Sequence, residues 1–123
     1  MAEDLLEVRI VKPPKSVKLG PRTIDIVMLP ELFDGISEQP GLCEIHERRV
    51  ILCESTCADT QRETTLHELL HQALHLAGLT CAHDSVKADI SEALEERLCI
   101  RVTPILLGLI RDNPRLVAYL MEK

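Results

Sequence analysis

Hydrophobic positions alternate in short runs in the first half of the chain and recur at three- and four-residue spacing in the second half. The alternation of apolar and polar residues over Arg22–Leu29 is typical of a half-buried strand. Two shorter runs, residues 42–46 and 49–54, flank a polar pair and predict a β-hairpin. A weaker alternation over residues 6–11 predicts another strand, and residues 31–38 are expected to form a short helical turn.

The stretch TTLHELLHQALHLAG, residues 64–78, has the pattern of an amphipathic helix. Its apolar residues at helical spacing are Leu66, Leu69, Leu70, Ala73, Leu74 and Ala77. We expect this helix to begin near Asp59 or Thr60, whose side chains can cap an N-terminus, and to end at Gly78.

The rest of the chain is helical by the same criterion. Apolar spacing predicts a helix over residues 85–102, which Pro104 interrupts or restarts. A stop signal at residues 112–114 separates it from a short helix over residues 115–121. We therefore predict one α+β domain, residues 1–123, in which a small antiparallel or mixed N-terminal sheet precedes an active-site helix and a helical C-terminal part.

Composition and charge narrow the functional classes. Hydrophobic residues make up 46 % of the chain and charged residues 28 %, the balance of a globular domain. The net charge of −6 disfavours nucleic-acid binding, and the one basic-leaning stretch, residues 11–22, is interpreted as a solvated loop. The N-terminus lacks a secretory signal pattern, and no apolar run is long enough to cross a bilayer. A cytoplasmic location without a membrane partner is therefore expected.

The strongest chemical pattern is HELLH at residues 67–71, which matches H-E-x-x-H. Residues four apart lie on one face of a helix, so His67 and His71 can bind one Zn²⁺ ion at about 2.0–2.1 Å. Glu68 lies about 100° around the helix from His67, near the open coordination position. A carboxylate there can take a proton from zinc-bound water and later give it to a leaving amine.

A catalytic zinc ion needs a third protein ligand. We favour Glu95, because it shares a helical stripe with apolar residues that points inward, where an unpaired carboxylate would be costly. Glu92 and Glu96 flank that stripe and stay open as alternatives. His83 could fold back from the following loop, and His75 lies about 6 Å further along the same helix, which makes an ion common to all three imidazoles strained.

The cysteines offer a second possible ligand set. Cys53, Cys57, Cys81 and His83 could form a structural zinc site, although their C-x3-C and C-x-H spacing is loose. An odd number of five cysteines in a chain without an export signal otherwise favours reduced thiols.

Three segments, RRVILCES, QRETTLHELLHQALHLAGL and SEALEERLCIRVTPILL, together resemble the minimal zincin metallopeptidases of the ImmA/IrrE type and their SprT-like relatives. The likeness is strongest to the short versions found in phage and prophage genomes, and it spans residues 42–120. The resemblance implies a small sheet, an active-site helix and a glutamate ligand from the next helix. It implies a hydrolase that uses Zn²⁺ as its cofactor.

Carried over by position, the resemblance makes His67 and His71 zinc ligands, Glu68 the general base and Glu95 the third ligand. The family's usual signature around the third ligand is absent, so the neighbouring glutamates remain alternatives.

A second likeness concerns HQALHLAGLTCAHD, which is similar to the H-G-x-L-H-L-x-G-Y-D-H signature of the YbeY endoribonucleases. That resemblance implies His71, His75 and a later histidine as metal ligands, but the expected last position is Cys81, and His83 comes two residues late. The acidic charge and the fit of Glu68 to a peptidase favour the first resemblance.

We therefore predict a zinc-dependent peptidase that hydrolyses a protein or peptide substrate aligned along the strand at residues 49–54. Two alternatives remain. One is a zincin-fold protein that binds a partner without catalysis, and the other is a YbeY-like metal-dependent endoribonuclease.

Overall fold

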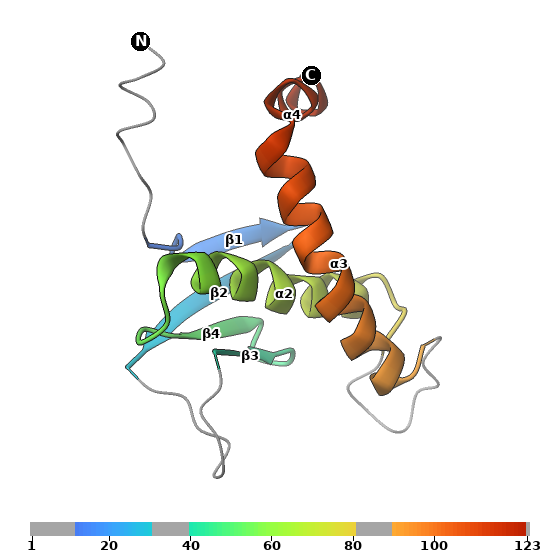
Figure 1. Cartoon of the computed structure of the whole chain (residues 1–123). Helices are drawn as coiled ribbons and strands as arrows, with labels where there is room; N and C mark the ends of the chain where they lie inside the picture. The colour runs from blue at the N-terminus through green and yellow to red at the C-terminus, as the bar shows by residue number, and fades with distance from the viewer. Residues whose placement is uncertain (1–11, 31–39, 81–89, 123) are drawn as a thin grey trace.

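The protein has an α+β architecture, in which a four-stranded mixed sheet is followed by helices (Figure 1). The computed structural model describes residues 12–30, 40–80 and 90–122. Its strands are β1 (Ser16–Leu19), β2 (Arg22–Leu29), β3 (Gly41–Glu44) and β4 (Arg49–Cys53). Its helices are α2 (Ala58–Leu76), α3 (Glu92–Asp112) and α4 (Pro114–Met121). The strand expected over residues 6–11 and the turn expected over 31–38 lie outside the described residues.

The strands are ordered β1-β2-β4-β3 across the sheet. β1 and β3 run antiparallel to their neighbours, whereas β2 and β4 run parallel to each other. β4 is consequently hydrogen-bonded on both sides, and β3 is the edge strand on its side of the sheet. The expected substrate alignment along residues 49–54 is therefore wrong, because β4 has no free edge there.

The region over residues 11–22 was expected to be a solvated loop, and this expectation is wrong for β1. Val17 and Leu19 pack against the core while Lys18 between them is exposed, which is the alternation of a strand. Gly20 has a φ of 58°, a left-handed conformation that glycine adopts at no steric cost, and it reverses the chain into β2.

The predicted hairpin is confirmed as β3 and β4, with shorter strands than the sequence pattern indicates. Residues 45–48 form the connection, and Arg48 adopts a positive φ of 52°. The core lies on one face of the sheet and consists of Ile24, Ile26, Val50 and Leu52. α2 covers that face and contributes Leu69 to the core (Figure 1).

The predicted amphipathic helix is confirmed as α2, and Gly78 follows its last turn with a φ of 79°. The expected N-cap is wrong. Cys57 occupies that position without a side-chain capping bond, and Asp59 lies inside the first turn, where it forms a 2.8 Å ion pair with Arg62.

The next predicted helix is present, but its limits differ. α3 begins at Glu92, and Ser91 caps it by accepting a hydrogen bond from the backbone N–H of Leu94 at 3.2 Å. Residue 90 and Ser91 are not helical, and residues 81–89 lie outside the described ranges. The expected break at Pro104 is wrong, because α3 continues through it. Pro104 lies on the exposed side, where water can bond the carbonyl that loses its amide donor.

The predicted C-terminal helix is confirmed as α4, with Pro114 in its first turn. α4 packs against the end of α3. None of the described helices is both long and apolar enough to span a membrane.

Candidate metal centre

Helix α2 places His67, Glu68 and His71 on the side that faces the cleft between this helix and β3. The two imidazoles are one turn apart, with ring centroids 5.0 Å from each other and an angle of 66° between the ring planes. Their side chains are largely but not fully buried, at 20 % exposure for His67 and 12 % for His71. The predicted pair of histidines therefore lies together at the edge of the core.

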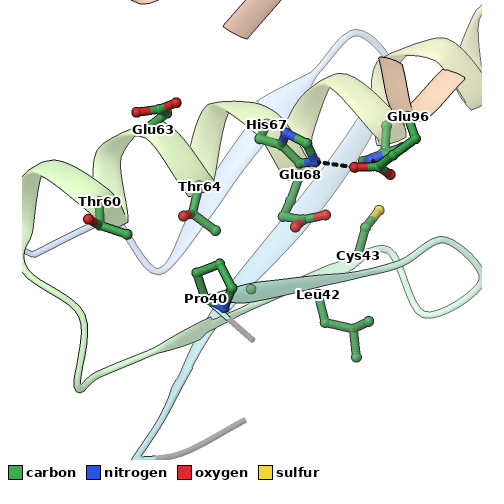
Figure 2. A pocket seen from close by; sticks show the side chains of 11 residues that line it. Pro40, Leu42, Cys43, Thr60, Glu63, Thr64, His67, Glu68 and Glu96 are labelled. Carbon is green, nitrogen blue, oxygen red and sulfur yellow. Dashed lines mark ion pairs between the residues drawn. The ribbon is translucent and has the colours of Figure 1, made fainter. Parts of the chain in front are cut away.

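Helix α3 brings a carboxylate to both imidazoles. The Oε1 atom of Glu96 lies 3.2 Å from Nε2 of His67, and its Oε2 atom lies 3.2 Å from Nε2 of His71 (Figure 2). Two atoms bound to one tetrahedral zinc ion at about 2.0–2.1 Å are separated by roughly 3.3 Å. One ligand atom from each of these three residues lies within 4.8 Å of the others, so the set can hold one metal ion.

Glu95, the expected third ligand, instead contacts the other nitrogen of His71. Its Oε2 atom forms a short hydrogen bond or ion pair with Nδ1 of His71. A carboxylate on Nδ1 holds the proton there and leaves Nε2 free for a metal, which is the usual outer arrangement around zinc-bound histidines. The geometry thus favours Glu96 as ligand and gives Glu95 the role of orienting His71.

The choice between adjacent glutamates depended on which face of α3 points inward. The expected stripe included Leu98, which is 36 % exposed in the structure. The fully buried positions of α3 are Cys99 and Thr103, and Glu96 precedes them at helical spacing of three and seven residues. The inward face therefore lies between the two glutamates: the Glu95 side chain is 20 % exposed, as expected, and the Glu96 side chain, which contacts both imidazoles from the rim, is 54 % exposed.

The other candidate ligands do not join this group. Glu92 and His75 line a neighbouring cavity of about 580 Å³, which Glu95 and Glu96 separate from the two histidines of the group. His83 lies outside the described residues. The YbeY-like interpretation requires His71 and His75 to bind the same ion. Among the described residues, His75 is not part of the group that could hold a metal.

Glu68 is the buried acid of the site, with 8 % of its surface exposed. Burial raises its pKa to about 7, the nearby His71 lowers it, and the negative charge of Glu96 raises it. A carboxyl group with a pKa near neutrality exchanges a proton readily at physiological pH. Figure 2 shows Glu68 pointing from α2 toward β3.

The cleft beside these residues has a volume of about 600 Å³ and lies between α2 and β3. One wall is Pro40 and the start of β3 as far as Cys43, and the other is α2 from Thr60 to His71. Figure 2 shows the side chain of Cys43 pointing from β3 toward Glu96. Burial, followed by the charge of Glu68, raises the pKa of the Cys43 thiol to about 12, so this thiol stays neutral.

Gly41 sets the width of the cleft at its start. A Cβ atom at this position would lie 2.4 Å from Cγ2 of Thr64 and 3.4 Å from Oε2 of Glu68. Only a glycine lets β3 approach α2 so closely. The sequence shows Gly41 only as part of a turn after Pro40, and a close approach between distant elements leaves no local signal.

Gln72 attaches the β3–β4 hairpin to α2. Its Nε2 atom donates to the carbonyl oxygen of Glu44 at 3.1 Å and to that of Arg49 at 3.4 Å, and the side chain is 1 % exposed. Glu44 and Arg49 also form an ion pair across the hairpin. No sequence pattern indicates this polar residue, which follows His71 directly and holds the edge strand in place.

The alternative cysteine site receives no support from the described residues. The Sγ atom of Cys53 lies 2.9 Å from Oγ of Ser55, whereas that of Cys57 lies 3.3 Å from Oγ1 of Thr60. Cys81 and His83 lie outside the described ranges. The thiols of Cys53 and Cys57 thus contact different hydroxyl groups.

The chain matches no protein-family model, no curated protein and no solved structure. These comparisons therefore support no family for the chain, and the zincin resemblance of the sequence remains an expectation.

Proposed function

We propose that this protein is a zinc-dependent peptidase in which His67, His71 and Glu96 hold the metal and Glu68 is the general base. The observation that carries the proposal is the contact of both Nε2 atoms with the Glu96 carboxylate, 3.2 Å in each case, beside a buried acid in an open cleft. Two imidazoles and one carboxylate are a known catalytic zinc set that leaves a coordination position open.

The donor chemistry fits zinc. The three ligand groups come from two packed helices, and the contact between Glu95 and Nδ1 of His71 selects the tautomer whose Nε2 faces the site. A zinc ion bound there would lower the pKa of a bound water and polarise a substrate carbonyl.

Glu68 is the residue of this chain that moves the proton. Its carboxylate is buried beside the ligands and has a pKa of about 7, so it can accept a proton from the attacking water and release it to the departing amine. Glu63, five residues earlier on the same helix, also lines the cleft but is exposed. A substitution of Glu63 is therefore a suitable control for the same substitution of Glu68.

The substrate we propose is an extended peptide that adds to the edge of β3. Among the described strands β3 ends the sheet on this side, and its residues 41–43 form one wall of the cleft together with Pro40. Backbone groups on a free strand edge can form hydrogen bonds with a peptide of any sequence. The side chains of the peptide would then enter the cleft. The proposed substrate position is therefore β3, the edge strand, and not β4 as expected from the sequence.

The test combines metal analysis with an internally quenched peptide library. We expect purified wild-type protein to hold one zinc ion per chain and to cleave members of the library. The Glu68→Gln variant should keep the zinc and lose at least about 100-fold in rate, whereas Glu63→Gln should stay within a few-fold of wild type. The His71→Ala variant should lose zinc.

Absence of stoichiometric zinc, or equal rates for the two glutamine variants, would refute the proposal. A protein that binds zinc but cleaves no library member would instead favour the non-catalytic, partner-binding alternative.

A further inference from the structure

The C-terminal half of α3 and the whole of α4 expose an unusual amount of apolar surface. Figure 1 shows α3 continuing past α2, with α4 at its far end, away from the sheet. Although the exposed Ile100 and Ile110 lie on other faces of α3, seven large apolar side chains of α3 and α4 on this surface are at least 36 % exposed: Leu98, Ile105, Leu109, Leu116, Tyr119, Leu120 and Met121. At ordinary side-chain areas they present roughly 700 Å², about what one partner buries in a stable protein interface.

Helix α4 is short and is supported mainly by α3. It has eight residues, and a helix this short is not stable in water unless tertiary contacts support it. In the described part of the chain its packing contacts are with α3, and none of its residues is buried. Tyr119 is 75 % exposed and Met121 is 73 % exposed.

Four apolar residues of α3 form a regular line that we call the outer stripe: Leu98, Ile105 and Leu109, which are exposed, and Val102, which is half-buried. Their spacing of four, three and four residues is that of a helix–helix seam. The stripe lies on a different face from Cys99 and Thr103, which are buried in the molecule. It is therefore available to a second helix with the same kind of spacing.

We propose that the outer stripe and α4 form the interface between two copies of this chain, with their α3 helices antiparallel. In that arrangement Leu98 meets Leu109 of the second copy, and Val102 meets Ile105, so each apolar layer is occupied by one residue from each chain. The contact is isologous and closes as a dimer.

Charges beside the stripe complement each other in this orientation. Arg101 is exposed at one end and Asp112 at the other, and within the described ranges neither forms an ion pair. The Oδ2 atom of Asp112 lies over Gly108, 3.8 Å from where a Cβ would be. In this register Arg101 lies opposite residue 106 of the second copy, and its long side chain can reach the Asp112 carboxylate near Gly108.

A parallel arrangement would instead leave Arg101 and Asp112 of the second copy on opposite flanks of the contact, too far apart to pair. The antiparallel orientation also brings α4 to the first turn of the second α3, where Leu94 is 38 % exposed. The apolar face of the short helix is thus covered by the same contact that covers the stripe.

The experiment is sedimentation equilibrium of the full chain, with concentrations reaching the high micromolar range. We expect wild type to be a dimer. Ile105→Asp should raise the dimer dissociation constant about tenfold or more. Ile100→Asp, on the other face of the same helix and 56 % exposed, should leave the constant unchanged. Circular dichroism of both variants confirms that α3 is retained.

A charge exchange tests the orientation. Arg101→Glu and Asp112→Arg should each weaken the dimer several-fold, and the double variant should restore the wild-type constant. A monomer at every concentration, an equal effect of the two isoleucine variants, or a double variant no tighter than the single ones would overturn the proposal.

Discussion

The Nε2 atom of His71 lies 3.2 Å from a carboxylate oxygen of Glu96, and this contact joins α2 to α3 at the cleft. The same imidazole contacts Glu95 through Nδ1. Two neighbouring glutamates on α3 therefore hold the two nitrogens of one histidine. The packing of α3 on α2 is part of the site, because it determines which carboxylate faces the metal position.

The first prediction separates the roles of these glutamates. Glu96→Gln should weaken zinc binding more than Glu95→Gln, because it replaces the proposed ligand rather than the partner of Nδ1. For Glu95→Gln we expect a loss of about 10- to 100-fold in zinc affinity. The measurement is competition for zinc against a chelator of known affinity.

Glu92→Gln is the matched control for both variants. It changes an acid in the first turn of the same helix that is not in the metal-binding group, so its zinc affinity should equal that of wild type. A stronger effect at Glu95 than at Glu96 would restore the ligand expected from the sequence.

The local elements of the fold could be predicted from the sequence because their signals are local. The period of two over β2, the helical spacing of α2 and the glycine after its last turn each depend on neighbouring residues. The position of β4 between β2 and β3 could not be predicted, because parallel pairing is decided by contacts between distant segments.

The candidate site, too, could be predicted from the sequence only where its residues belong to one helix. The H-E-x-x-H pattern places two imidazoles and one acid relative to each other because one helix fixes all three. The third ligand depends on how α3 is rotated about its axis, and one residue changes the direction of a side chain by about 100°. Cys99 and Thr103, neither of them strongly apolar, are the buried positions that fix this rotation.

The second prediction concerns the close approach of β3 and α2. Gly41→Ala should destabilise the protein by about 1–3 kcal/mol, because its Cβ would overlap Cγ2 of Thr64 at 2.4 Å. The measurement is the free energy of unfolding in urea. Thr64→Ser removes that methyl group and keeps the hydroxyl, so the double variant should recover most of the loss. If the losses of the two single variants simply add, the overlap is not the cause.

The third prediction links the buried acid to pH. The pKa of Glu68 is raised to about 7, so the folded chain binds more protons than the unfolded chain between about pH 4.5 and 7. Metal-free wild type should therefore lose stability as the pH rises through this range. Glu68→Gln carries no titrating group there and should lose less.

The comparison is made as unfolding free energies in the presence of a chelator. At pH 8 the advantage of Glu68→Gln over wild type should be larger than at pH 4.5 by on the order of 1–3 kcal/mol. Glu63→Gln, which changes an exposed acid on the same helix, should show no such difference. A pH-independent difference between wild type and Glu68→Gln would mean that the folded state does not raise this pKa.

The fourth prediction ranks two thiols by reactivity. Cys57 is exposed at the start of α2, and hydrogen bonding to Thr60 lowers its pKa, whereas burial raises the pKa of Cys43 to about 12. Because the thiolate is the nucleophile, iodoacetamide at pH 8 should alkylate Cys57 at least about 100-fold faster. Peptide mapping by mass spectrometry reads each site separately. Thr60→Val should slow Cys57 and leave Cys43 unchanged, whereas denaturant should remove the difference between them, because both pKa shifts depend on the folded chain.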